Sequence, residues 1–231
     1  MARFWTWSEI KAKVEADLAL EGEEFVGETE LLAYANEAID EAEAEVHAIY
    51  EDYFLSRATV TFVSGTDDYV LPSDIYAQKI RSVLYRNGSS VAVVPRLRDW
   101  KKFQNYTLNL TTSASAGCYN YLLINSTAGS PKILFTPPVL ESGAYITVWY
   151  LRQANRLTVD ADVCDIPEFV SFVIQHMKVR CYEKEGHPML QKAMYDLEQQ
   201  RKQMNDTLTA MVPDQENEIE ADLSSYFEQT A

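Results

Sequence analysis

The apolar residues follow a helical period at both ends of the chain and a strand period in the middle. Near the N-terminus they recur three and four positions apart, which predicts a short amphipathic helix. The positions are Trp7, Ile10, Val14 and Leu18. Thr6 and Glu9 have the spacing of a capping box, in which each side chain accepts a backbone N–H at the start of a helix. We therefore expect the helix to begin just after Thr6.

A second, longer helix is predicted to begin near Thr29, whose hydroxyl can cap it. Its apolar stripe consists of Leu32, Ala35, Ile39, Ala42, Val46, Ile49 and Tyr53. The opposite face carries mostly Glu and Asp, a pattern typical of a solvated helix face.

From Arg57 the period changes to two, which indicates about six short β-strands. The runs with this pattern are ATVTFVSG, DDYVLP, KIRSVLYRNG, SSVAVVP, YNYLLINS, PKILFTPP and AYITVWYLRQ. Asn87 and Gly88 form the residue pair preferred in a type I′ hairpin turn. The run beginning DWKK predicts one helical turn. We interpret the Ser/Thr/Asn-rich segment 107–130 that follows as a long loop away from the sheet or as a solvent-exposed sheet edge.

The helical period returns at Asp165, which can cap a helix with Pro167 in its first turn and Glu168 at its third position. Gly186 stands where that helix should stop, and a further helix follows Pro188. The pattern predicts an α+β fold. It consists of an amphipathic four-helix bundle (1–56 and 156–212), an inserted antiparallel β domain (57–155) and a C-terminal tail (213–231).

Acidic residues concentrate at the two ends of the chain, whose formal net charge is -15. Residues 1–56 hold 15 acidic and 3 basic residues, whereas residues 57–155 hold 5 acidic and 10 basic. The tail holds 6 acidic residues and none that are basic. Such asymmetry points to contacts between regions of unlike charge.

The sequence lacks the common catalytic and cofactor motifs: there is no P-loop, GxGxxG, GxSxG or HExxH. The histidines (His47, His176 and His187) have no spacing that places two on one helical face, and the three cysteines have no CxxC spacing. We therefore expect a protein that is not an enzyme and that needs no metal and no cofactor.

Basic residues gather in the first half of the predicted β domain, with Tyr85 and Trp100 between them. They are Lys79, Arg81, Arg86, Arg96, Arg98, Lys101 and Lys102. This pattern resembles a groove for single-stranded nucleic acid or phosphate, although the acidic charge of the whole chain opposes that use. The favoured interpretation is a subunit interface in a symmetric ring, in which Arg96, Arg98, Lys101 and Lys102 meet the acidic helices of the next copy.

Two motifs resemble those of tailed-phage head-to-tail adaptor proteins. The first is YVLPSDIY, with Tyr69, Leu71, Pro72 and Asp74, followed by a strand that ends in Asn-Gly. The second is IPEFVSFVIQHMKVRCYEKEGHP, with Pro167, Tyr182 and Gly186. The Asn36-Glu37-Ala38 run is similar to one in the second helix of that family. The resemblance spans nearly the whole chain. Among types of adaptor, the chain most resembles the podovirus type (tail tubular protein A, or gatekeeper-like connector).

The resemblance implies a ring, dodecameric in the family, that sits beneath the portal at the head–tail junction of the virion. There it would extend the DNA channel, dock the next tail or nozzle protein, and serve genome retention and ejection. Double-stranded DNA would pass without sequence-specific binding. The opening MARFWTWSEI has no signal-peptide pattern and no run is long enough to span a membrane, so we expect synthesis in the host cytoplasm.

The tail carries apolar residues three and four positions apart: Ile219, Leu223, Tyr226 and Phe227. Its composition favours disorder in the free protein, while this spacing favours ordering on a partner, which the resemblance identifies as the portal. A different function is a β module that binds carbohydrate or a host surface through exposed Tyr, Trp and Asn side chains.

Overall fold

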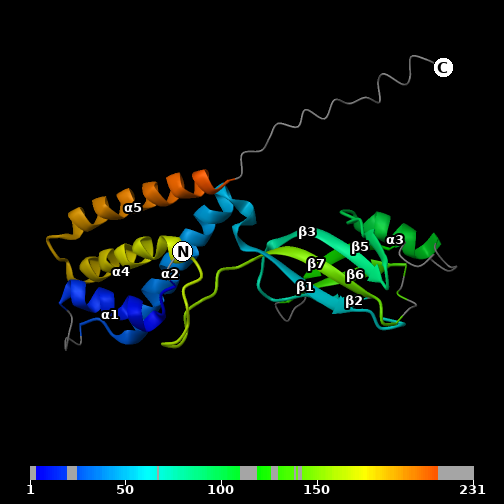
Figure 1. Ribbon diagram of the computed structural model, residues 1–231, viewed down its shortest axis with the longest axis horizontal. Helices are drawn as coiled ribbons and strands as arrows, with labels where there is room; N and C mark the ends of the chain where they lie inside the picture. Colours follow the sequence, from blue (N-terminus) through cyan, green and yellow to red (C-terminus); the bar gives the residue numbers. More distant parts are fainter. Residues whose placement is uncertain are drawn as a thin grey trace, which may run out of the picture.

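The computed structural model describes residues 4–19, 25–66, 68–109, 119–125, 130–137, 139 and 142–212. It is an α+β structure with antiparallel sheets, in which most helices lie at one end and the strands at the other (Figure 1). The helices are α1 (Trp7–Leu18), α2 (Glu28–Ile49), η1 (Glu51–Phe54), α3 (Trp100–Asn109), η2 (Pro167–Phe169), α4 (Val170–Glu185) and α5 (Leu190–Met211). The strands are β1 (Leu55–Thr61), β2 (Asp68–Val70), β3 (Ile75–Asn87), β4 (Ser90–Val93), β5 (Asn120–Asn125), β6 (Pro131–Thr136) and β7 (Tyr145–Arg152).

Helices from both ends of the chain share one hydrophobic core. We call α1, α2, α4 and α5 the helical part; α4 contacts each of the other three. Its core includes Ile10 and Val14 of α1, Ile39 of α2, Met177 of α4 and Leu208 of α5. The predicted capping box of α1 is confirmed: the Glu9 N–H donates to Thr6 Oγ1 at 3.3 Å, and the Thr6 N–H donates to Glu9 Oε2 at 3.0 Å. Caps of this kind stabilise a helix by about 1 kcal/mol.

Two predicted helix starts are wrong. α2 begins at Glu28 with Gly27 as its N-cap, not at Thr29, and Leu31 rather than Leu32 is buried. α4 begins at Val170 after the 3-10 turn η2, because Asp165 is engaged elsewhere. Asp165 Oδ2 accepts hydrogen bonds from Arg152 Nη1 at 2.5 Å and from the Asn155 N–H at 3.0 Å. These hydrogen bonds direct the Asp165 carboxylate toward the end of β7, and the residue at the N-cap position of η2 is Ile166 instead.

The strands form two antiparallel sheets around a second core. One sheet has the order β1-β7-β3-β4 and the other β2-β6-β5. We call these strands together with α3 the β part. Its core is rich in aromatic rings, and Phe62 is in ring contact with four of them: Tyr69, Tyr85, Tyr119 and Phe135. Residues 95–97 join the sheets, since Leu97 N donates to Tyr121 O at 2.7 Å and Tyr121 N to Pro95 O at 3.0 Å.

The β3–β4 hairpin and α3 both differ in detail from expectation. Asn87 pairs with Ser90, so the turn residues are Gly88 and Ser89. Only Gly88 has a positive φ, 58°, which fits a type II′ turn better than the predicted type I′. α3 is ten residues long instead of one turn. Asp99 supports its start, because the Lys101 N–H donates to Asp99 Oδ1 at 2.8 Å.

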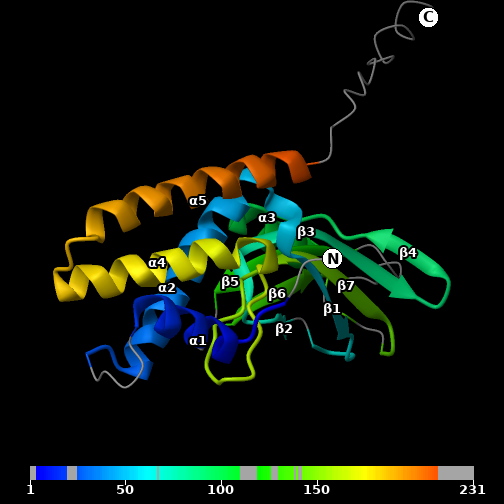
Figure 2. The same ribbon diagram turned by 60° about the vertical axis from the view of Figure 1, so that its left-hand side comes forward.

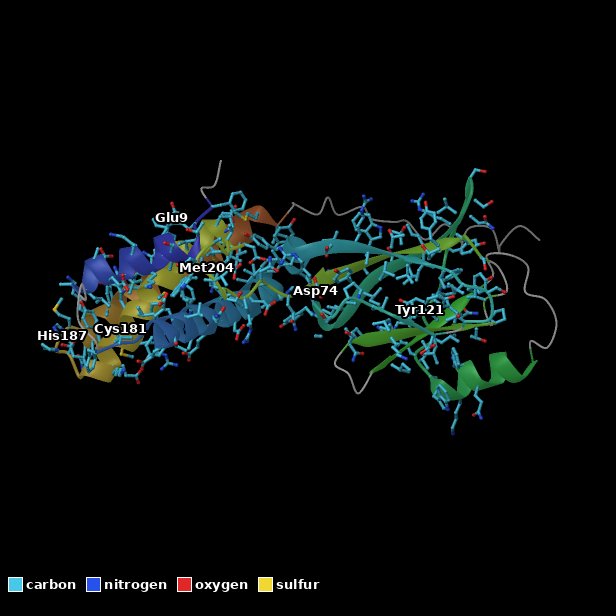
Figure 3. All side chains as sticks on the ribbon, turned by 90° about the horizontal axis from the view of Figure 1, so that it is seen from below. Glu9, Asp74, Tyr121, Cys181, His187 and Met204 are labelled. Atoms are coloured by element: carbon cyan, nitrogen blue, oxygen red, sulfur yellow. The ribbon has the colours of Figure 1, made fainter. Side chains whose placement is uncertain are left out.

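The backbone passes between the helical part and the β part twice, along β1 and β7. These strands pair from Leu55↔Leu151 to Thr61↔Tyr145, so the two passages lie side by side. Asp74 lies near this junction (Figure 3). Its backbone carbonyl accepts a hydrogen bond from the Gln153 N–H at 2.6 Å, which ties the start of β3 to the end of β7.

Candidate interaction surface

Four basic side chains lie on the surface of the β part where β4 gives way to α3. Arg96 and Arg98 belong to the segment between these elements, and Lys101 and Lys102 belong to the first turn of α3. All four are exposed. Within the described residues, none of the four side chains has an ion pair or hydrogen bond. We call them the basic patch.

An open groove of about 400 Å³ adjoins the basic patch. Its lining comes from Ile80–Val83 of β3, from residues 93–98 and from Tyr121. Burial raises the pKa of the Tyr121 phenol, while the nearby Arg96 charge opposes that shift. Arg81 Nη2 donates to Glu51 Oε2 at 2.5 Å, and its Nε donates to Asp52 Oδ1 at 2.8 Å. Since Arg81 is paired, the positive charge of the groove comes from Arg96 and Arg98, and Val83, Val93 and Val94 give it an apolar lining.

The acidic face of α2 differs from the freely solvated face that its sequence predicts. Its carboxylates bind cations of the later helices and of the segment before them. The pairs are Glu30–Lys184, Glu37–Arg180, Asp40–Arg156 and Glu41–Arg201. Each exposed pair contributes modestly, about 0.2–1 kcal/mol, but together they neutralise much of this face. The cations of the helical part are thus largely paired within the chain, whereas those of the basic patch have no ion pair with any residue that the structure describes.

The Asn36-Glu37-Ala38 run has a structural role at each position. Asn36 Oδ1 accepts the Leu157 N–H at 2.8 Å, and Asn36 Nδ2 donates to Leu157 O at 2.9 Å. Glu37 binds Arg180, and Ala38 is fully buried. Asn36 therefore fastens α2 to the chain that returns from the β part. The sequence indicated this run only through its resemblance to a family.

The motif YVLPSD runs from β2 of one sheet to the start of β3 in the other, and its side chains fix this connection. The Tyr69 hydroxyl accepts the Val63 N–H at 3.0 Å and lies 3.1 Å from the carbonyl oxygens of Val63 and Thr66. Leu71 is buried, and its N–H donates to Pro131 O at 2.9 Å. Pro72 follows in the turn, and Asp74 Oδ1 accepts the Tyr150 hydroxyl at 3.2 Å. These contacts hold the β part in shape.

The second motif begins and ends α4. Pro167 opens the 3-10 turn η2 that leads into the helix. Gly186 ends α4 in the left-handed conformation with a φ of 67°, as predicted, and its N–H bonds back to Glu183 O and Tyr182 O. The Tyr182 ring stacks on His187 with centroids 4.7 Å apart. The motif residues therefore stabilise a helix and its end.

The predicted portal-binding residues Ile219, Leu223, Tyr226 and Phe227 lie outside the described residues, as does most of the Ser/Thr/Asn-rich segment. Four tyrosines of the β part (Tyr69, Tyr85, Tyr119 and Tyr121) are buried in its core, so they are not available to bind a carbohydrate from solution. Trp100 is exposed, and its ring stacks on Phe103 with centroids 5.5 Å apart.

Burial shifts the pKa values of the histidines and cysteines in the helical core toward their uncharged forms. Burial lowers the pKa of His47 and of His176, and it raises the pKa of the Cys164 and Cys181 thiols to about 11. The described residues contain no group of three or more His, Cys, Asp or Glu side chains placed to hold a metal ion. Each helix within the described ranges is too short or too polar to cross a lipid bilayer.

The motif residues of this α+β chain hold its structure, and its exposed cationic surface is of the kind that proteins of macromolecular assemblies use to bind partners. The model of the SU10 adaptor protein family matches residues 5–221, and the chain therefore belongs to this family of phage head–tail adaptors. Membership confirms the predicted structural adaptor role, and it implies contacts with portal and tail proteins at the head–tail junction of the virion. A comparison with curated proteins gave no match.

Proposed function

We propose that copies of this chain form a ring, a dodecamer by resemblance, below the portal, where it extends the DNA channel and connects the head to the tail. In this role the ring retains the packaged genome and lets it leave during ejection, and double-stranded DNA passes through its channel without sequence-specific binding. Family membership supports the adaptor role. The type of adaptor is the podovirus type, similar to tail tubular protein A.

The observation that carries the ring is the unequal pairing of cations. Arg156, Arg180, Lys184 and Arg201 bind carboxylates of the same chain, so they are satisfied in the monomer. The basic patch has no such partner within the described residues. Unpaired arginine on one side of a subunit is the residue type that interfaces favour, and it can orient a neighbouring acidic surface.

Each part of the chain has its own task in this proposal. The helical part acts as a four-helix bundle that forms one domain from residues 1–56 and 156–212. The β part, residues 57–155, is an inserted domain that presents the basic patch to the next subunit. The tail, 213–231, binds the portal through Ile219, Leu223, Tyr226 and Phe227, because a few buried apolar anchors dominate contacts of this kind.

Imaging of intact virions tests the proposal. We expect density for this chain as a closed ring between the portal and the next tail protein, with the β part of one subunit against its neighbour. The mass of the purified protein should rise to that of a ring when portal is added. A chain that stays monomeric with portal, or that lies at the distal end of the tail, contradicts the proposal.

A further inference from the structure

β4 covers only part of one edge of β3. The two strands pair from Asn87↔Ser90 to Leu84↔Val93, and the last hydrogen bond runs from Val94 N to Val83 O at 2.8 Å. At Pro95 the chain turns away to pair with Tyr121 of β5. In the part of the chain that the structure describes, no strand continues the place of β4 beside Ile80–Ser82. The edge of β3 is open there, and an open edge is a template for another strand.

This open edge lies in the cationic groove. Ile80, Arg81 and Ser82 line it on one side, and Arg96 and Arg98 on the other. Both of those arginine side chains are exposed and unpaired among the described residues, whereas Arg81 is held by η1. The matching ligand is an extended segment that offers backbone N–H and C=O groups to β3, carboxylates to the arginines and small apolar side chains to the valines.

The C-terminal segment contains a sequence of this kind. Residues 216–223 read ENEIEADL, in which acidic residues occupy every even position from Glu216 to Asp222. In a strand, successive side chains point to opposite faces. The carboxylates would therefore lie on one face and Ile219 and Leu223 on the other. The tail has no basic residue that could neutralise its own carboxylates, whereas most carboxylates of α2 have partners within the chain.

The position at which the C-terminal segment leaves α5 also agrees with binding in this groove. α5 ends at Met211, at the end of the helical part that faces the β part, where η1 also lies (Figures 1 and 2). Arg81 of the groove bonds to η1, so the groove starts on the same side of the molecule. Fully extended, residues 213–231 can span up to about 60 Å.

We propose that the groove between β3 and residues 93–98 binds residues 216–223 of the same chain as an added β-strand, with carboxylates on Arg96 and Arg98. This inference deepens the proposed function and rests on it, because the subunit interface uses the same arginines and the portal takes the same segment.

Hydrogen exchange on the full-length monomer tests the added strand directly. The variant Glu218→Lys/Glu220→Lys/Asp222→Lys reverses the segment's charge. We expect the amides on the open edge of β3, above all that of Arg81, which has no pairing partner on β7, to exchange at least tenfold faster than in the unchanged chain, because they lose the added strand. The control Glu185→Lys/Asp196→Lys/Asp206→Lys makes the same charge change on α4 and α5 and should leave these amides unchanged. Equal exchange in the first variant and the unchanged chain overturns the proposal.

A second measurement uses the chain ending at Val212 and a synthetic peptide of residues 213–231. Both described cores are complete by Leu208, so the shortened chain retains them. Arg96→Glu/Arg98→Glu should weaken peptide binding at least tenfold, whereas Lys192→Glu/Lys202→Glu, which changes two exposed lysines of α5, should not. A peptide in which residues 216–223 are reordered to EEEDNIAL keeps the charge without alternation. If it binds as well as the natural order, the contact is only ionic and the added strand is wrong.

The oligomeric state separates the two possible sources of the strand. If full-length chains form dimers that dissociate when the segment is removed, the strand comes from a second copy and the assignment to the same chain is wrong. Neither measurement contains portal or rings. Their failure, with ring assembly still sensitive to the basic patch, would leave the proposed function standing. If the peptide binds but ring assembly does not depend on the basic patch, the added strand stands and the proposed subunit interface is wrong.

Discussion

The imidazole ring of His47 stacks on the phenol ring of Tyr76, with centroids 3.8 Å apart and planes inclined by 20°. His47 lies in the last turn of α2, and Tyr76 is the second residue of β3, so the stack joins the helical part to the β part. The Phe54 ring of η1 also contacts the imidazole ring, with centroids 5.5 Å apart. Burial, and then the nearby Lys79 ammonium, lower the pKa of His47.

This lowered pKa predicts a loss of stability on mild acidification. The unfolded imidazole takes up a proton with a pKa of about 6.5, while the folded one resists protonation, so the free energy of unfolding should fall as the pH drops from about 7.5 to about 5.5. His176 contributes in the same direction, because burial also lowers its pKa. Chemical denaturation across this pH range measures the slope.

The variant His47→Phe keeps a ring for the stack and removes the titration, so its slope should be shallower. Glu43 has the opposite sign, since burial raises its pKa and acidification then favours the folded state. Glu43 Oε1 lies 3.9 Å from His47 Nε2, so the difference between the two proteins reports the titration of His47 together with its effect on Glu43. Identical slopes in the two proteins would show that the imidazole does not titrate differently on folding.

The variant Asn36→Ala should destabilise the protein by about 1–3 kcal/mol, because it leaves the backbone N–H and C=O of Leu157 without their partners. Thr29→Ala, at an exposed position in the first turn of the same helix, should change the stability by less than about 0.5 kcal/mol. Equilibrium unfolding in urea compares them. An Asn36→Ala variant as stable as the Thr29→Ala control would mean that water replaces both hydrogen bonds.

Reversing charge in the basic patch should weaken ring assembly while leaving the monomer folded. We expect Arg96→Glu/Arg98→Glu and Lys101→Glu/Lys102→Glu each to reduce the assembled fraction at low salt and to weaken its salt dependence. The matched control is Lys192→Glu/Lys202→Glu on α5. Sedimentation with portal present measures the ring, and circular dichroism checks the fold. Normal assembly of all four reversals together would exclude the patch as an interface.

Removing residues 213–231 should lower the melting temperature by no more than a few degrees, because the described cores end at Leu208 and only the strand proposed to add to β3 is lost. The same truncation should abolish attachment to the portal. Replacing Leu223, Tyr226 and Phe227 with Ala should have most of that effect, since apolar anchors dominate such contacts. Pull-down with portal measures both, and capture of the truncated chain at the affinity of the full chain would contradict the prediction.

Local signals in the sequence predicted local structure well. Thr6 and Glu9 are three residues apart, and Gly186 stops α4 through its own backbone conformation, so the information lay within one turn. The change of period at Arg57 likewise predicted the change from helix to strand. The start of α4 was missed because Asp165 binds Arg152, on the preceding strand, rather than the helix.

Long-range pairing could not be predicted in this way. Glu41 and Arg201 are 160 residues apart, and nothing near either one distinguishes a paired charge from a solvated one. For the same reason, the sequence predicted a solvated acidic face on α2, whereas the structure shows carboxylates of this face in ion pairs. The basic patch was found because its four residues are neighbours in the sequence. The groove beside it was not, because it depends on where β4 leaves β3.

The side-by-side passage of β1 and β7 has a mechanical consequence. Tension applied to the β part is shared by two backbones that pair from Leu55↔Leu151 onward, instead of acting on a single linker. Two adjacent strands bend easily out of the plane of their sheet, but rotation within that plane would stretch one strand against the other. We therefore expect the β part to move relative to the helices mainly as a hinge, whereas a single linker would allow rotation in every direction.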